Sequence, residues 1–219
     1  DVPFYEPGLS ERVERTTAAG RLMFTEDLFH AVAVSDIIFI AVGTPQSEDG
    51  SADLSAVYAV AESVFDAIRQ LESASFKVLV NKSTVPVGTG KRVEELRASA
   101  GLTSDDIAVV SNPEFLREGS SIYDFFHPDR VVLGSSSQRA LKVLSELYDP
   151  LYRTETPIVK TNLESSELSK YASNAFLATK ISFINEMANL CELTGADVKD
   201  VAKIMGMDGR IGKYFLHPG

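Results

Sequence analysis

The sequence predicts an α/β fold, in which a parallel sheet is flanked by helices and followed by a long helix. Short apolar runs rich in β-branched residues alternate with segments of helical periodicity, which is typical of βαβ units built around a parallel sheet. Beyond them, residues 162–193 keep a helical spacing with apolar or small side chains on almost every side. The chain has 219 residues, so it can bury roughly 70% of the surface that its unfolded form exposes.

Five segments are predicted as strands. Residues 36–42 form a nearly continuous apolar run that ends at Gly43, as expected for a strand buried on both faces. The later segments are shorter, and turn-forming or small residues follow most of them. The predicted strands are residues 36–42, 76–80, 107–110, 130–134 and 157–160.

Helices are predicted between and after these strands. In residues 53–71 the apolar side chains recur at helical spacing, and Asp53 is placed to cap the first turn. Residues 161–164, Thr-Asn-Leu-Glu, look like a capping box for the long helix, which Gly195 ends. The long helix is so apolar that we expect it to lie between domains or subunits. The other predicted helices are one after the N-terminal loop, one from Thr89 to about Ala100, and residues 137–148 and 197–205.

Composition excludes several classes of function. The 31 acidic and 21 basic residues give a formal charge of -10, which argues against nucleic acid or an anionic membrane as partner. The single cysteine, Cys191, and three scattered histidines predict no disulfide and no metal site, and favour a reducing, cytoplasmic location. The longest apolar run is far shorter than the roughly 20 residues of a membrane span.

Two loops leave predicted strands with residues suited to a ligand. Residues 43–45, Gly-Thr-Pro, would let a ribose or diphosphate approach the main chain, although glycine and proline also simply end strands. Ser83 and Thr84 precede a predicted helix N-terminus, whose free N–H groups favour an anion or a developing oxyanion. An ordinary helix cap is the alternative for that second loop.

Charged residues form two further candidates. Glu114 and Glu118 follow the third strand four residues apart, as a general base or ribose ligand would, or they form a salt-bridged turn with Arg117. On the long helix, Glu167, Lys170 and Asn174 make a polar stripe on an apolar surface. Burying such groups is costly unless they are paired, so the stripe indicates a site. The alternative is that Lys170 extends its charged end to solvent or pairs with Glu167.

Taken together, these motifs resemble the UDP-glucose/GDP-mannose dehydrogenase family over essentially the whole chain, and its UDP-glucose branch most closely. The matching segments are residues 4–9, 39–45, 82–89, 112–119, 126–130, 170–174, 185–186 and 210–212. Family members carry a G-x-G-x-x-G unit ahead of the first segment and a catalytic cysteine in an F-G-G-x-C motif beyond the last. The resemblance therefore implies a fragment that lacks both and is inactive alone, and Cys191 is not that cysteine.

The resemblance also implies an organisation and an activity. Residues 1–161 would be an NAD-binding, partial Rossmann-like domain without its first βαβ unit, and residues 162–219 a truncated, all-α central dimerisation domain. A homodimer would form through residues 162–193. The parent enzyme would oxidise UDP-glucose at C6 to UDP-glucuronate with NAD in two successive hydride transfers, for polysaccharide precursor supply. Alternatives are a sibling enzyme for UDP-N-acetylmannosamine or GDP-mannose, and a non-catalytic dimerising homologue.

Site residues follow from the same motifs, as the resemblance implies them. The catalytic residues would be Thr84, Glu114, Lys170 and Asn174. The NAD-binding residues would be Gly43, Thr44, Pro45, Ser83, Thr84 and Glu118. The substrate-binding residues would be Glu114, Phe115, Leu116, Arg117, Lys170, Asn174 and Arg210, the last reaching the partner's substrate across the dimer.

Overall fold

A computed structural model describes residues 2–72, 75–152 and 156–218 of the chain. The outermost residues of the two predicted terminal loops, Asp1 and Gly219, lie outside the described residues. The chain divides into two compact units, Asp1–Lys170 and Tyr171–Gly219. The predicted boundary at residues 161 and 162 stays a prediction.

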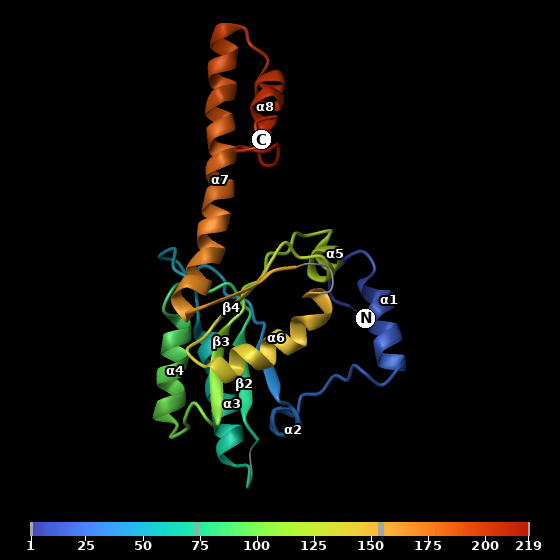
Figure 1. Cartoon of the computed structure of the whole chain (residues 1–219), viewed down its shortest axis with the longest axis vertical. Helices are drawn as coiled ribbons and strands as arrows, with labels where there is room; N and C mark the ends of the chain where they lie inside the picture. The colour runs from blue at the N-terminus through green and yellow to red at the C-terminus, as the bar shows by residue number, and fades with distance from the viewer. Residues whose placement is uncertain (1, 73–74, 153–155, 219) are drawn as a thin grey trace. The chain divides into compact units, whose positions relative to one another are not determined.

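The first unit is built on a five-stranded sheet with the order β1-β2-β3-β4-β5 (Figure 1). Each strand lies within about two residues of its prediction. The strands are β1 Ile37–Ile40, β2 Lys77–Asn81, β3 Ile107–Ser111, β4 Val131–Gly134 and β5 Ile158–Thr161. Pairing is parallel between β1 and β2, β2 and β3, and β4 and β5.

The sheet departs from the predicted parallel arrangement at one place, because β3 and β4 pair antiparallel through Ser111 and Gly134. The segment that joins them contains the six-residue helix α5, Ser121–Phe126. Since the strands are antiparallel neighbours, this segment leaves and re-enters the sheet at the same edge instead of crossing back over it. It therefore holds residues 112–119 at the carboxyl edge of β3, where a ligand site is expected.

Helices cover both faces of the sheet because its strands alternate apolar side chains toward each face. Leu79 of β2 packs in one core cluster, with α2 Leu28–Val34, α3 Ser55–Arg69 and α4 Thr89–Ser99. Its neighbours Val78 and Val80 pack in the other, against α6 Gln138–Tyr152. Figure 1 shows α6 lying across the sheet. The predicted α/β class is confirmed.

The helix ends refine the predictions. Helix α1, Leu9–Ala18, is the one expected after the N-terminal loop, whereas α2 and α5 were not predicted. The predicted end of α6 at Tyr148 is wrong, because the helix continues to Tyr152 with Pro150 in its last turn. The capping box is also shifted, since Thr161 ends β5 and Asn162 Oδ1 accepts from Ser165 N at 2.8 Å. The predicted N-cap Asp53 is also wrong, because Leu54 is the N-cap of α3 and has no side-chain cap bond. The Asp53 carboxylate lies one residue earlier and accepts from Ser55 N at 2.9 Å.

The second unit contains the later part of α7, Leu163–Thr194, and α8, Val198–Gly206. Figure 1 shows α8 running beside that part of α7. Ile184, Cys191 and Leu216 are buried in this unit, but many apolar side chains on α7 and α8 are exposed in the single chain. Among the described residues, no helix is both long and apolar enough to cross a membrane.

Candidate functional site

The loops that follow β1 and β2 are tied together by side-chain hydrogen bonds. Ser83 Oγ accepts from Val42 N at 3.0 Å and donates to Val42 O at 2.7 Å. Thr44 Oγ1 donates to Thr84 O at 2.8 Å. These contacts bring Gly43, Thr44, Ser83 and Thr84 to one edge of the sheet, although the two loops are about 40 residues apart in the sequence. Gly43 has open space where a side chain would stand.

The start of α4 is occupied by a carboxylate from α7. The backbone N–H groups of Gly88 and Gly90 each donate to a different oxygen of Glu167, both at 2.7 Å. Glu167 is buried, and this burial raises the pKa of its carboxyl although both N–H bonds oppose the change. The expectation that these N–H groups are free for a ligand anion is therefore wrong for Gly88 and Gly90, because Glu167 takes them.

The most suggestive contact joins the loop after β3 to the start of α7. Lys170 Nζ lies 2.8 Å from Glu114 Oε1, and the two side chains are only 9% and 29% exposed. The second oxygen, Oε2, accepts from Leu116 N at 2.6 Å. The alternative in which Lys170 pairs with Glu167 is wrong, since Glu167 holds α4 instead. The pair places a carboxylate that can accept a proton beside a cation that can stabilise a developing oxyanion.

Phe115 lies between two cations at this site. The Arg130 guanidinium stands 3.7 Å from the ring centroid, and Lys170 Nζ stands 5.4 Å from it. Both distances are within the range of a cation–π interaction. Phe115 therefore helps to orient Lys170 and Arg130, a role that no pattern in the sequence predicts.

Arg117 pairs with Asp124, whereas the predicted salt-bridged turn would pair it with Glu114 or Glu118. Its guanidinium forms two bonds to Asp124 of α5, at 2.6 and 3.0 Å, and its backbone N donates to the same carboxylate at 2.9 Å. These bonds lower the pKa of Asp124 to about 2. These contacts favour Asp124 over Glu114 or Glu118 as the acid that anchors Arg117. Leu116, Arg117 and Glu118 are exposed at the surface of this loop.

Sequence reasoning missed a polar network beneath the Glu114 loop. Asn112 Oδ1 accepts from Tyr148 Oη at 2.6 Å and lies 3.4 Å from Lys82 Nζ, while Asn112 Nδ2 donates to Val132 O at 2.9 Å. Burial lowers the pKa of Lys82 to about 8, an effect that Glu114 opposes and Lys170 reinforces. Burial also raises the pKa of Tyr148 to about 12. The available signal was the position of Lys82 at the carboxyl end of a buried strand.

The remaining candidate residues belong to the second unit. Asn174 is exposed on α7, and Arg210 forms an ion pair with Asp208 at 2.6 Å while its side chain is 90% exposed. Burial of the predicted polar stripe thus holds for Glu167 and Lys170 but not for Asn174 in this single chain. The roles assigned to Asn174 and Arg210 stay predictions.

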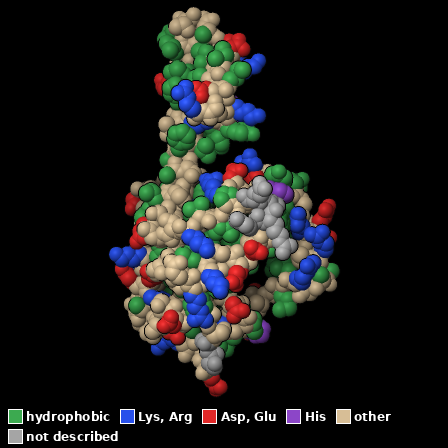
Figure 2. Space-filling view, viewed as in Figure 1, with side chains coloured by type: hydrophobic (Ala, Val, Ile, Leu, Met, Phe, Trp, Pro, Cys, Tyr) green, Lys and Arg blue, Asp and Glu red, His purple; other side chains and the backbone are tan. Residues whose placement is uncertain are grey.

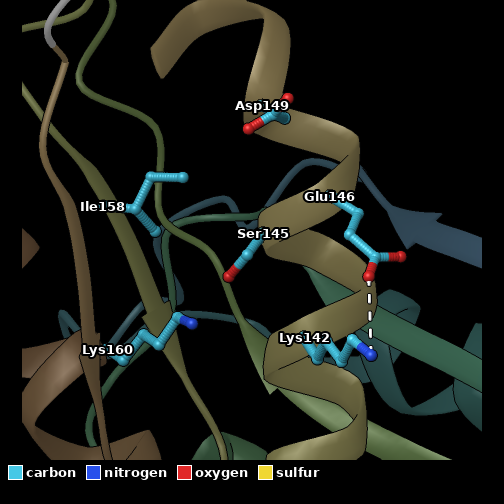
Figure 3. Close-up of a pocket in the computed structure, with 6 residues that line it drawn as sticks. All are labelled: Lys142, Ser145, Glu146, Asp149, Ile158 and Lys160. Atoms are coloured by element: carbon cyan, nitrogen blue, oxygen red, sulfur yellow. Dashed lines mark ion pairs between the residues drawn. The ribbon is translucent and has the colours of Figure 1, made fainter.

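A pocket elsewhere on the first unit shares no residue with this site. Figure 3 shows its lining residues on α6 and β5, which are two lysines, two acids, Ser145 and Ile158. The volume of this hollow is ≈ 350 Å³. Lys142 in its wall pairs with Glu146 at 3.9 Å. Figure 2 likewise shows basic and acidic side chains interspersed on the visible face of the first unit. Within the described ranges, no cluster of three His, Cys, Asp or Glu side chains could hold a metal ion.

Comparison with known proteins agrees with the fold. Residues 1–152 match the NAD binding domain of the UDP-glucose/GDP-mannose dehydrogenase family, and residues 164–219 match its central domain. A UDP-glucose 6-dehydrogenase of Rhizobium meliloti (strain 1021) is 54% identical over 100% of this chain and 49% of that protein.

Solved structures give the same picture. A UDP-glucose dehydrogenase from Pyrobaculum islandicum is similar with a TM-score of 0.91 and 44% identity, over 99% of this chain and 49% of that one. A GDP-mannose dehydrogenase from Pseudomonas aeruginosa is similar with a TM-score of 0.87 and 33% identity, over 99% and 50%. The chain thus spans about half the length of these relatives. Because both domain matches together cover nearly all of it, the chain belongs to the UDP-glucose/GDP-mannose dehydrogenase family.

Proposed function

We propose that the chain supplies the NAD-binding and central parts of an enzyme that oxidises UDP-glucose at C6 to UDP-glucuronate. The contact between Glu114 and Lys170 is the observation that carries this proposal. Oxidation of an alcohol needs a group that takes the hydroxyl proton and a positive charge beside the oxygen that loses it. Glu114 and Lys170 supply both within one hydrogen bond of each other.

The first-unit residues have distinct roles in this proposal. Glu114 takes part in the proton transfers, and Leu116 N fixes the carboxylate through its second oxygen. Lys170 stabilises the alkoxide or oxyanion as its charge develops. Thr84 positions water, with its loop held by the bond from Thr44 to its carbonyl oxygen. Asn174 is proposed to add an amide donor to the same oxygen.

NAD supplies the hydride acceptor when it is bound, and the residues of the first unit fit it in part. Gly43 leaves open space beside the main chain, and Pro45 and Glu118 are exposed, as contacts to a dinucleotide require. The Ser83 hydroxyl is already bonded on both sides to Val42. We therefore assign Ser83 to holding the loop after β1 in place, and assign the direct contacts to Gly43, Thr44, Pro45, Thr84 and Glu118.

The choice of UDP-glucose rests on the relatives. The curated relative at 54% identity is named for UDP-glucose, whereas the GDP-mannose dehydrogenase structure is 33% identical. Phe115, Leu116 and Arg117 are proposed to contact the nucleotide sugar, and Arg210 the partner subunit's substrate. A homodimer through residues 162–193 would cover exposed apolar side chains of the second unit such as Phe176. The cytoplasmic location stays a prediction.

The test assays the longest reading frame that contains this chain. NADH formation is measured with UDP-glucose, GDP-mannose and UDP-N-acetylmannosamine in parallel. We expect turnover with UDP-glucose alone, with two NADH formed per sugar. Turnover with another sugar alone would reassign the substrate, and none with any of them would favour a non-catalytic homologue. The isolated 219-residue chain is expected to form no NADH, and light scattering on it tests the dimer.

Two variants test the contact between Glu114 and Lys170 in the same assay. Glu114→Gln and Lys170→Met should each lower kcat by about 100-fold or more. Lys142→Met is the matched control, because Lys142 is exposed on α6 outside the site. Normal turnover in both site variants would refute the roles given to this pair.

A further inference from the structure

A second lysine lies close to the Glu114–Lys170 pair and has no role in the function proposed above. Lys82 directly follows β2, and its backbone N donates to Ile40 O at 2.9 Å, which continues the ladder between β1 and β2. The main chain at Lys82 is therefore part of the sheet edge and not of a mobile loop. Its side chain is half-buried.

The side chain of Lys82 meets a fixed acceptor. Its Nζ lies 3.4 Å from Asn112 Oδ1. That amide is itself immobilised, because Tyr148 donates to the same oxygen and Asn112 Nδ2 donates to the main chain of β4. Asn112 is 2% exposed and stands two residues before Glu114. The amide thus links the lysine after β2 to the loop that carries the candidate base.

Glu114 and Lys170 are charged groups near Lys82, and both affect its ammonium form. Burial has the largest effect and disfavours the ammonium form of Lys82, the charge of Glu114 favours it, and the charge of Lys170 disfavours it. Through Asn112 the lysine also faces the Tyr148 hydroxyl, which is neutral at physiological pH because burial raises its pKa to about 12. Two ammonium groups therefore act on one carboxylate, of which Lys170 makes the direct bond.

We propose that Lys82 is a positioning residue for Glu114. Its positive charge holds the Glu114 carboxylate in place while Lys170 stabilises the negative charge that develops on the reacting oxygen. This inference rests on the proposed function, in which Lys170 must turn part of its charge from Glu114 toward a developing oxyanion. A carboxylate with Lys170 as its only neighbouring cation would lose compensation at that moment. Lys82 keeps the charge of Glu114 balanced throughout.

The first experiment titrates Lys82 in the chain itself, without nucleotide. Lysines are labelled competitively with trace acetic anhydride from about pH 6 to about pH 11, a range that spans an ordinary lysine pKa, and the acetylated peptides are quantified by mass spectrometry. We expect Lys82 to titrate near the pKa of about 8. Glu114→Gln should lower this pKa and Lys170→Met should raise it, because the first removes an attractive charge and the second a repulsive one.

The matched control is Lys142→Met, which removes an exposed lysine of α6 and should leave the titration of Lys82 unchanged. An ordinary lysine titration at Lys82, or one that ignores both Glu114→Gln and Lys170→Met, would overturn the proposal. Because no sugar nucleotide is present, this result does not depend on the identity of the substrate. A failed turnover assay with an intact Lys82 titration would overturn the function alone.

A second readout follows the position of Glu114 directly. Leu116 N donates to Glu114 Oε2, so hydrogen exchange at this amide reports how well the carboxylate is held. Lys82→Met should accelerate that exchange about fivefold, the factor that corresponds to a loss of roughly 1 kcal/mol. Lys82→Arg, which keeps the charge, should restore the slow exchange. Unchanged exchange in Lys82→Met, or equal acceleration in both variants, would show that the charge of Lys82 does not position Glu114.

Discussion

Replacing Glu167 with glutamine tests how strongly the start of α7 is tied to the start of α4. The carboxylate accepts one backbone N–H bond on each oxygen, both at 2.7 Å, and it is 2% exposed. Glutamine keeps one acceptor and turns an NH₂ group toward the other N–H group, so one charge-assisted bond is lost. Such a bond contributes about 1.5 to 3 kcal/mol, and relief of the buried charge returns part of it. We expect a net loss of about 2 kcal/mol in the free energy of unfolding.

The assay is urea denaturation followed by circular dichroism, with Glu62→Gln as control. Glu62 is exposed in α3, and its substitution should change the free energy of unfolding by less than about 0.5 kcal/mol. A Glu167→Gln chain within that same margin of the wild type would refute the view that this carboxylate stabilises α4.

The same variant has a defined pH dependence. Burial in the folded state raises the pKa of the Glu167 carboxyl above its ordinary value of 4.5. The folded chain therefore binds a proton at Glu167 more tightly than the unfolded chain does. The contribution of this group to stability is therefore fully present below pH 4.5 and falls as pH rises through the folded pKa. The gap in stability between wild type and Glu167→Gln should narrow over that window, and a gap that widens would reverse the assignment.

The remaining predictions concern packing and a surface pair. Gly134→Ala should destabilise the first unit by about 3 kcal/mol in the same urea assay, because a Cβ atom would stand 2.5 Å from the backbone oxygen of Asn162; Gly209→Ala, with open space around it, is the control, and equal effects would contradict the argument. Asp124→Asn should remove a stability loss that the wild type shows as pH falls from 3.8 to about 2, the window set by the lowered pKa beside Arg117. We expect that loss to be about 1 kcal/mol, since the arginine is exposed, and parallel pH profiles of the two proteins in thermal unfolding would contradict it.

Much of the fold could be predicted because the pattern of apolar residues carries it. The five strands are short apolar or β-branched runs, of which β2, β3 and β4 are fully buried whereas β1 and β5 are partly exposed. Helices α3, α4 and α6 present several turns of helical periodicity each. Helices α2 and α5 have seven and six residues, too few for a period to stand out. The antiparallel pairing of β3 and β4 depends on the path of the segment between them, which no local pattern records.

For the candidate site, the sequence indicates several of the residues but not their partners. Glu114 is indicated by its position after the third strand and Lys170 by its position on an apolar helix. Their contact spans 56 residues, however, and depends on where the start of α7 lies in the fold. The spacing of Glu167 on the helix predicts a polar stripe, but its partners are the backbone N–H groups of Gly88 and Gly90, which have no side chains to suggest a pairing. The position of Lys82 after a buried strand is only a weak signal, because a lysine after a strand usually faces solvent.

The first eight residues of α7 impose a constraint on how this sequence can change. Leu163 packs in the core, Ser166 Oγ donates to Ser111 O at 3.1 Å, Glu167 holds α4 and Lys170 holds Glu114. An α-helix turns by about 100° per residue, so inserting or deleting one residue here would swing each later side chain away from its partner. Length changes should therefore be tolerated in the loop around Asp49, where the chain is exposed, and rejected between Leu163 and Lys170.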